Sequence, residues 1–177
     1  MQKLKLDELN RVSVATFKEL KKLPVVMVLD SVRSMHNVGS VFRTSDAFAI
    51  ESLYLCGITG QPPHREIEKT ALGATQSVNW QYFEDITTAI QQLKAAGYTV
   101  LAIEQVSTSI SILDFHPTAD AKYAFIFGNE VNGVSEAALP LVDGCIEIPQ
   151  FGTKHSFNVS VTAGIVLWDI FTKLQSL

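Results

Sequence analysis

The stretch VVMVLDSVRSMHNVGSVFRTSDAF, residues 25–48, joins an apolar segment to a polar one and decides the fold class. Its first six residues, 25–30, are apolar enough for a strand that is buried on both faces. A polar turn with Asn37 follows, and a helical pattern over residues 38–49 then carries Arg43. A buried strand that leads into a helix is the repeating unit of an α/β protein.

The same alternation continues along the rest of the chain. Further strand candidates are residues 52–57, 78–83, 98–104, 122–128 and 145–150. Further helix candidates are residues 6–22, 85–96, 135–141 and 157–174. Because the strands are this apolar, we expect an α/β fold with a mostly parallel sheet and helices on both faces.

Composition narrows the class of protein. The 177 residues are 47% hydrophobic and 18% charged, which suits one folded domain and excludes a disordered chain. No apolar run is long enough to span a membrane, and the first residues lack a signal-peptide core, so we expect a cytoplasmic protein. The formal net charge of -4 excludes a uniformly basic nucleic-acid binder. We expect Cys56 and Cys145 to be buried thiols rather than a disulfide.

Ligands of such sheets bind at the carboxyl ends of the strands, so the segments after strands are where a site is expected. Three of these segments, residues 30–48, 125–139 and 146–171, are rich in Asn, Gly and Ser. In the first, unpaired amides at the helix start are donors for a ligand, and Arg43 lies one to two turns further on. The alternative is that Asn37 caps the helix and Arg43 is a solvated side chain.

The second segment has Gly128 and Gly133 at the spacing of a phosphate loop. A Walker A loop is not expected, because Val134 and Ser135 stand where it needs Lys and Ser or Thr. Glu130 lies in the middle of the segment. It is either a site residue or an exposed loop carboxylate.

The third segment places Ser156 and Asn158 at the start of a long apolar helix. Either side chain is a candidate N-cap, and both are candidate site residues. His155 precedes Ser156 without the G-x-S-x-G pattern of a nucleophile elbow. The histidines show no metal-ligand spacing, so we expect no metal site.

Taken in order, the three segments resemble the motifs of the SpoU/TrmH family of RNA ribose 2′-O-methyltransferases, in the SPOUT superfamily. The Asn and Arg of the first motif fall on Asn37 and Arg43. The Gly-x-Glu-x-x-Gly pattern of the second falls on Gly128, Glu130 and Gly133.

The third motif of the family is a Pro followed later by Ser-Leu-Asn-Val-Ser. It falls on Pro149 and on residues 156–160, where Phe157 replaces the usual Leu. The resemblance covers nearly all of residues 25–171.

The resemblance implies an α/β domain of SPOUT type over residues 23–177, with a C-terminal trefoil knot, after an N-terminal helical extension at residues 1–22. It also implies a homodimer, RNA as the partner and S-adenosyl-L-methionine as the cofactor. The residues that it implies around the cofactor are Glu104, Gly128, Ile148, Ser156, Phe157 and Asn158.

The implied reaction is methyl transfer to a ribose 2′-hydroxyl of tRNA or rRNA. Its implied catalytic residues are Arg43, Asn37, Glu130, Ser156 and Asn158. Family proposals make Arg43 the group that activates the hydroxyl. Because neutralising an arginine at pH 7 costs about 7 kcal/mol, the second possibility is that Arg43 binds phosphate and stabilises the alkoxide. The proton then leaves through Ser156 or water.

Roles for the other motif residues follow from motif position. Asn37 orients Arg43 or the substrate backbone, and Asn158 hydrogen-bonds loop backbone and ligand. Glu130 either holds the second loop or pairs with Arg43, within one chain or across the dimer.

Two other function classes remain open at this point. A non-catalytic RNA- or nucleotide-binding module on the same fold is favoured by the pI of about 5.5 and by Phe157. The intact polar residues of the three motifs oppose it. A dinucleotide-dependent oxidoreductase would need G-x-G-x-x-G after the first strand, and the chain has none there.

Overall fold

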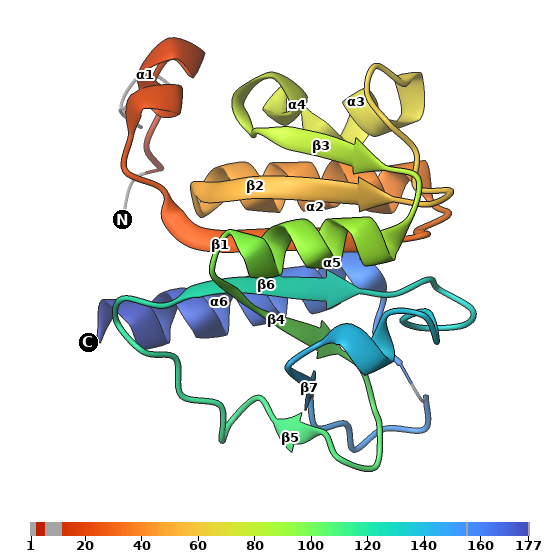
Figure 1. Cartoon of the computed structure of the whole chain (residues 1–177). Helices are drawn as coiled ribbons and strands as arrows, with labels where there is room; N and C mark the ends of the chain where they lie inside the picture. The colour runs from red at the N-terminus through yellow and green to blue at the C-terminus, as the bar shows by residue number, and fades with distance from the viewer. Residues whose placement is uncertain (1–2, 6–11, 155, 177) are drawn as a thin grey trace.

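A seven-stranded sheet forms the centre of the computed structural model, which describes residues 3–5, 12–154 and 156–176. The strand order is β3-β2-β1-β6-β4-β7-β5, and every neighbouring pair is parallel (Figure 1). The strands are β1 (Leu23–Asp30), β2 (Ile50–Cys56), β3 (Trp80–Phe83), β4 (Tyr98–Ile103), β5 (Ile110–Ser111), β6 (Lys122–Phe127) and β7 (Gly144–Glu147).

Helices cover both faces of this sheet (Figure 1). One face carries α2 (Met35–Ala47), α3 (Arg65–Ala71), α4 (Ala74–Ser77) and α6 (Val159–Gln175), and the other carries α5 (Ile86–Ala95). On β1, Met27 and Leu29 pack in the α2 and α6 layer, whereas Val26 and Val28 pack in the α5 layer. Because the strand buries side chains on both faces, the predicted α/β fold with a parallel sheet is confirmed.

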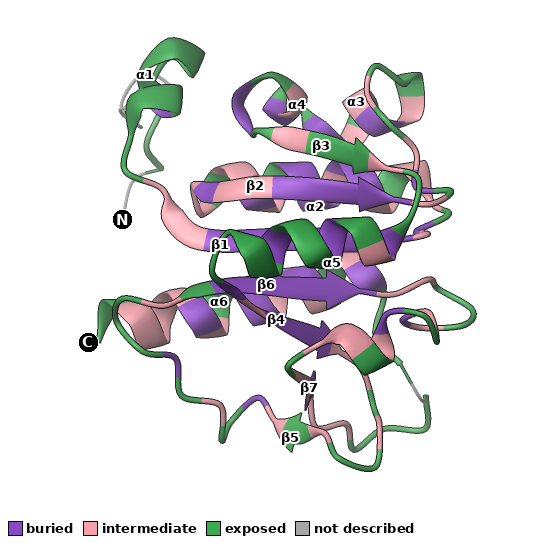
Figure 2. Cartoon of the chain, in the orientation of Figure 1, coloured by how far each residue is buried: buried purple, intermediate pink, exposed green. Residues whose placement is uncertain are grey.

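Buried residues follow the central strands, whereas the outer side of α5 is exposed (Figure 2). Cys56 on β2 is fully buried and Cys145 on β7 is half-buried, and both are free thiols as predicted. Burial raises the pKa of Cys56 to about 12, with smaller contributions from Asp30 and Asp85. Cys56 is therefore part of the core rather than a nucleophile.

The helix predicted over residues 135–141 is wrong. Only a short 3-10 helix, η2 (Leu139–Leu141), forms there. Pro140 has no N–H to donate to the preceding turn, and the N–H of Ser135 is bound by the carboxylate of Asp30 at 2.8 Å. The elements α3, α4 and β5 were not predicted, because each is too short to show a clear period.

The two helix starts at the N-terminal end also differ from the prediction. In the described part of predicted helix 6–22, α1 spans only Val14–Glu19 behind the N-cap Ser13, and residues 6–11 lie outside the described residues. Helix α2 begins at Met35 rather than at residue 38, and Ser34 is its N-cap. The Ser34 hydroxyl accepts from the N–H of Asn37 at 3.3 Å, so the interpretation of Asn37 as the cap is wrong.

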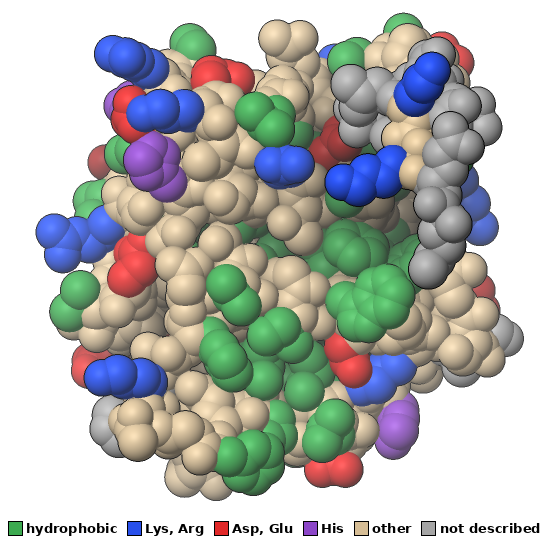
Figure 3. All heavy atoms as spheres, turned by 180° about the vertical axis from the view of Figure 1, so that it is seen from behind, with side chains coloured by type: hydrophobic (Ala, Val, Ile, Leu, Met, Phe, Trp, Pro, Cys, Tyr) green, Lys and Arg blue, Asp and Glu red, His purple; other side chains and the backbone are tan. Residues whose placement is uncertain are grey.

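The face that carries α2 and α6 exposes hydrophobic side chains, which gather over the lower half of the molecule in Figure 3. On α6, Trp168 is 60% exposed and Val161 is 50% exposed. The rings of Phe48 and Phe171 pack against Trp168, with centroids 6.4 and 6.3 Å away. Within the described ranges, no helix combines the length and the apolar character that a membrane span requires.

Candidate active site

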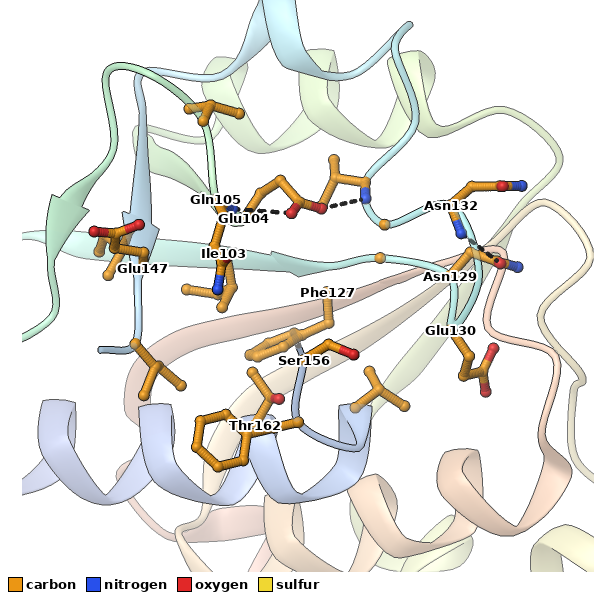
Figure 4. Close-up of a pocket in the computed structure, with 18 of the residues that line it drawn as sticks. Ile103, Glu104, Gln105, Phe127, Asn129, Glu130, Asn132, Glu147, Ser156 and Thr162 are labelled. Atoms are coloured by element: carbon orange, nitrogen blue, oxygen red, sulfur yellow. Dashed lines mark hydrogen bonds between the residues drawn. The ribbon is translucent and has the colours of Figure 1, made fainter. Parts of the chain in front are cut away.

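The carboxyl ends of β4, β6 and β7 border a pocket of about 710 Å3 (Figure 4). Glu104 enters it after β4, and residues 128–134 enter it after β6. Ile148 follows β7, and residues 156–159 lead into α6. This is the edge of a parallel sheet where small ligands bind, and the volume suits a nucleoside-sized molecule.

The structure brings most of the predicted site residues together around this one pocket. Those expected to hold the cofactor all line it: Glu104, Gly128, Ile148, Ser156, Phe157 and Asn158. Glu130 lines it as well. Asn37 and Arg43, the remaining predicted catalytic residues, lie on α2 and do not line it.

The glycines of the second motif allow a tight loop after β6. A Cβ on Gly128 would lie 2.0 Å from the carbonyl carbon of Gly133, so only glycine fits there. Asn129 and Gly133 exchange two backbone hydrogen bonds of 2.8 and 2.9 Å, and Gly133 has a left-handed φ of 69°. The spacing of the two glycines therefore reflects loop closure rather than a phosphate loop.

Glu104 fastens this loop to the end of β4. Its carboxylate accepts hydrogen bonds from the N–H groups of Gln105 and Val134, both at 2.9 Å (Figure 4). A side chain on Gly133 would collide with this carboxylate, 2.2 Å from the Cβ position. Glu104 thus lines the pocket and also holds the neighbouring loop of the pocket wall in place.

Glu130 binds the start of α2. Its carboxylate accepts hydrogen bonds from the N–H of Arg33 at 2.9 Å, the N–H of Ser34 at 3.1 Å and Nδ2 of Asn37 at 3.1 Å. Desolvation raises the pKa of Glu130, but these hydrogen bonds outweigh it and leave that pKa below its ordinary value. Within the chain, Glu130 therefore partners the backbone ahead of α2 rather than Arg43.

Asn37 connects this carboxylate to α6. While its Nδ2 donates to Glu130, its Oδ1 accepts from Nδ2 of Asn158 at 3.1 Å. Asn158 is the N-cap of α6 and accepts from the N–H of Ser160 at 2.9 Å. Ser156 is exposed and is not the cap. One chain of polar side chains thus joins all three motifs.

Arg43 lies on the exposed side of α2, six residues after Asn37. Its guanidinium makes no hydrogen bond or ion pair with any residue that the structure describes. A free guanidinium at this position is available to an anion from outside the chain, such as an RNA phosphate. The contact between Arg43 and Asn37 that the motif suggested is not present in the chain.

The pocket is acidic. Four glutamates line it, and no Lys or Arg does among the described residues: Glu104, Glu130, Glu136 and Glu147. In Figure 4, Glu147 and Glu130 lie at opposite sides of the view. Such a lining attracts a cationic ligand and offers no charge partner to a phosphate.

Sequence reasoning missed Gln105, Glu136 and Glu147 as pocket residues. Glu147 ends β7 and accepts a hydrogen bond of 3.1 Å from the hydroxyl of Ser109. The available signal was its position at the end of a predicted strand, which is where site residues of a parallel sheet lie. The described residues contain no group of three or more His, Cys, Asp or Glu placed to hold a metal ion.

Comparison with known proteins identifies the family. The model of the SpoU rRNA Methylase family matches residues 24–168. The tRNA (guanosine(18)-2′-O)-methyltransferase of Thermus thermophilus is 33% identical over 148 residues, which cover 82% of this chain and 73% of that protein. The 23S rRNA (guanosine-2′-O-)-methyltransferase of Neisseria meningitidis serogroup B is 28% identical over 148 residues, which cover 84% of this chain and 58% of that protein.

A solved structure agrees in fold. The crystal structure of an AdoMet-bound rRNA methyltransferase from Sinorhizobium meliloti matches with a TM-score of 0.80 and 23% sequence identity. The match covers 89% of this chain and 60% of that one. This chain spans less than two thirds of the length of several relatives that it matches. The matched family model nevertheless runs through all three motifs and nearly the whole sheet, and the chain belongs to the SpoU rRNA Methylase family, within the SPOUT superfamily.

Proposed function

We propose that this chain transfers a methyl group from S-adenosyl-L-methionine to a ribose 2′-hydroxyl of tRNA or rRNA. The observation that carries the proposal is the acidic pocket at the carboxyl edge of the sheet, lined by four glutamates and by no described Lys or Arg. S-adenosyl-L-methionine bears a cationic sulfonium and an ammonium group, which such a lining stabilises. A dinucleotide would bring an anionic diphosphate that finds no partner there, so the oxidoreductase alternative is disfavoured.

Relatives support the same substrate class. The Thermus and Neisseria proteins are named as ribose methyltransferases of tRNA and of 23S rRNA, and the Sinorhizobium structure is described as AdoMet-bound. Because these RNAs are available in the cytoplasm, the proposal also places the protein there.

The residues of the chain fit the cofactor. Bound S-adenosyl-L-methionine supplies an electrophilic methyl group on a cationic sulfur. Glu104 and the tight loop between Gly128 and Gly133 form one part of its pocket wall, and Phe157 and Asn158, just before α6, form another. These walls hold the donor in a fixed place and reduce access of water.

Arg43 serves the RNA. Arginine side chains keep their proton at neutral pH, so we assign Arg43 to the phosphate and to the developing alkoxide rather than to proton removal. The hydroxyl proton leaves through Ser156, which is exposed at the pocket, or through water. Asn37, held by Glu130 and Asn158, fixes the first turn of the helix that carries Arg43.

The proposal includes a homodimer. The exposed apolar side chains of α6, including Val161 and Trp168, form the surface that a second copy would cover. This face lies on the layer that also carries Arg43 on α2. Arg43 of one copy is thereby placed to bind a phosphate of an RNA that contacts both copies near their interface.

The finer architecture is also a proposal. We assign residues 1–22 to an N-terminal extension and residues 23–177 to the methyltransferase domain. The path of the chain supports a trefoil knot. The chain forms β5 at the edge of the sheet and then returns to form β6 between β1 and β4. The C-terminal segment then returns from β7 to pack α6 against α2, where Asn158 meets Asn37.

The test of the function uses tritiated S-adenosyl-L-methionine with total tRNA and, separately, rRNA from cells that lack this gene. Label in one pool, located by nuclease digestion at a 2′-O-methylated nucleotide, is the expected result. Cofactor binding without label in either pool would point to a substrate that exists only in an assembly intermediate, such as a ribosomal particle. Absence of both label and cofactor binding would reject the proposal and favour the non-catalytic RNA-binding module.

A further inference from the structure

The loop between β7 and α6 carries an aromatic side chain that packs against nothing. Phe151 is 98% exposed, more than any other large hydrophobic residue that the structure describes. Phenylalanine is a predominantly buried residue type, so a ring that is wholly in solvent calls for a partner. The surroundings of this loop indicate what that partner is.

The loop lies at the rim of the proposed cofactor pocket. Gln150, directly before Phe151, lines the pocket, and so does Ser156 at the other end of the loop. Phe151 itself does not line it, so its ring stands outside the space for the cofactor. In Figure 1 the segment between β7 and α6 lies at the edge toward which the strand arrows point.

A cation accompanies the ring. Lys154, three residues further on, is exposed and makes no hydrogen bond or ion pair with any described residue. Gly152 lies between them, and a Cβ built on it meets nothing within 4 Å. Ring and ammonium group are thus both accessible from solvent, and no neighbouring atom crowds Gly152 in the loop between them.

The chemistry of this pair fits a nucleotide. Unpaired RNA bases stack on aromatic side chains, and a lysine three residues further along the same loop suits the phosphate. A protein partner would require a continuous apolar surface, but the neighbours of Phe151 in the loop are Gln150, Gly152 and Thr153. A fully exposed ring with polar neighbours in sequence, in a loop that also carries an exposed cation, favours a base.

We propose that Phe151 stacks on an unpaired base of the RNA next to the ribose that is methylated, and that Lys154 binds a phosphate of the same nucleotide. The proposal rests on the proposed function and adds a residue that determines which RNA is accepted. It implies that the substrate presents an unpaired nucleotide beside its target, as loops and bulges do.

The test compares Phe151→Ala, Phe151→Leu and Phe151→Trp by RNA affinity, by the KM for RNA and by the Kd for the cofactor. Phe151→Ala should weaken RNA binding about 5- to 100-fold, the effect of losing one base–aromatic stack. Phe151→Leu keeps an apolar side chain but no ring, so it should behave like Phe151→Ala. Phe151→Trp should stay within about 3-fold of the wild type, since indole offers a larger face. The Kd for the cofactor should change less than about 2-fold in all three.

Controls separate stacking from general effects. Leu113→Ala removes a side chain that is 69% exposed at another loop and should leave RNA affinity unchanged. Lys154→Ala should reduce the slope of log RNA affinity against log salt concentration by about one, which corresponds to one fewer ion released on binding. In Phe151→Trp, RNA should quench the added fluorescence, measured against the wild type with its own Trp80 and Trp168.

Three outcomes would overturn the inference. The first is unchanged RNA affinity in Phe151→Ala, and the second is wild-type RNA affinity in Phe151→Leu. The third is a change of oligomeric state in Phe151→Ala, which would assign the ring to the contact between two copies. Failure of the proposed function gives a different pattern, because the wild type itself would then label no RNA. Affinity and quenching would still decide whether Phe151 contacts RNA.

Discussion

Asn37 and Asn158 are 121 residues apart in the chain, yet Nδ2 of Asn158 donates a hydrogen bond of 3.1 Å to Oδ1 of Asn37. Glu130 binds the other end of the same Asn37 amide. Two pocket residues are thereby coupled to the first turn of α2, the helix that carries Arg43. The position of Arg43 thus depends on the loops that form the pocket.

Glu130→Gln should loosen the start of α2. A neutral amide cannot replace the carboxylate that accepts three hydrogen bonds next to a helix N-terminus. Because Glu130 is partly exposed, we expect a loss of about 0.5–1.5 kcal/mol in the free energy of unfolding, measured by urea denaturation at pH 7. The matched control is Glu136→Gln, which changes a pocket glutamate for which the structure shows no hydrogen bond. Equal losses in both variants would contradict the assignment.

Arg43→Ala should abolish methyl transfer and leave the fold and cofactor binding intact. Its side chain has no partner among the described residues and does not line the pocket. The expected loss in kcat is at least about 100-fold, with the Kd for the cofactor unchanged by isothermal titration. Arg65→Ala, another exposed arginine, is the control. A parallel loss of cofactor affinity would sink the assignment.

Arg43→Lys separates the two possible roles of this side chain. Lysine keeps the charge but loses the planar fork that binds phosphate. If Arg43 positions phosphate, Arg43→Lys stays impaired at every pH. Recovery of turnover as the pH rises toward 10 would instead identify the group as the base, since lysine loses its proton more readily than arginine.

Ala49→Gly should stabilise the protein. Ala49 has a φ of 47° in the turn between α2 and β2, a left-handed conformation that costs a non-glycine residue about 1 kcal/mol. We expect a gain of about 0.5–1 kcal/mol, read from the thermal midpoint. Ala47→Gly, at the last residue of α2, should instead lose stability, because there glycine only adds backbone entropy to the unfolded chain. A loss in both variants would contradict the argument.

Trp168→Glu should produce a monomer if α6 forms the proposed dimer surface. A charge at this side chain, 60% exposed in the single chain, stays hydrated there and loses only the ring contacts with Phe48 and Phe171, but it is unfavourable inside an apolar interface. Sedimentation equilibrium measures the mass directly. Leu113→Glu, which places the same charge at a residue that is 69% exposed, should leave the mass unchanged.

Stability should fall on acidification. For Glu130 and Asp143, desolvation raises the pKa, but hydrogen bonds outweigh it and leave each pKa below its ordinary value of 4.5 and 3.8. For Asp143 the donors are Lys94 at 2.7 Å and the N–H of Val100 at 2.8 Å.

A carboxylate whose pKa is lower in the folded protein than in the unfolded chain stabilises the fold fully when the pH is above the unfolded-state pKa. This stabilisation is lost as the pH falls through the folded-state pKa. Urea midpoints should therefore be level from pH 7 to about pH 5 and decline below about pH 4. The double variant Glu130→Gln, Asp143→Asn should have a lower urea midpoint at pH 7, and that midpoint should decline less steeply on acidification. An unchanged slope would show that other groups carry the acid dependence.

The fold class was readable from local pattern, because β1, β4, β6 and the second half of β2 are largely apolar runs of strand length, which are typical of a sheet buried on both faces. The site was readable in part, because the polar residues after those strands must meet at one edge of a parallel sheet. Short elements such as β5 and α3 escaped prediction because their formation depends on the neighbours that they pack against.

By itself, the amino-acid sequence determined the parallel α/β fold and the position of three polar segments after strands. Both follow from periodicity and from the chemistry of single residues. Only the tertiary structure decided that Glu130 binds the start of α2 rather than Arg43, and that four glutamates share one pocket. The contacts of Glu130 join residues up to 97 positions apart, so they depend on the order of strands in the sheet, which no local pattern encodes.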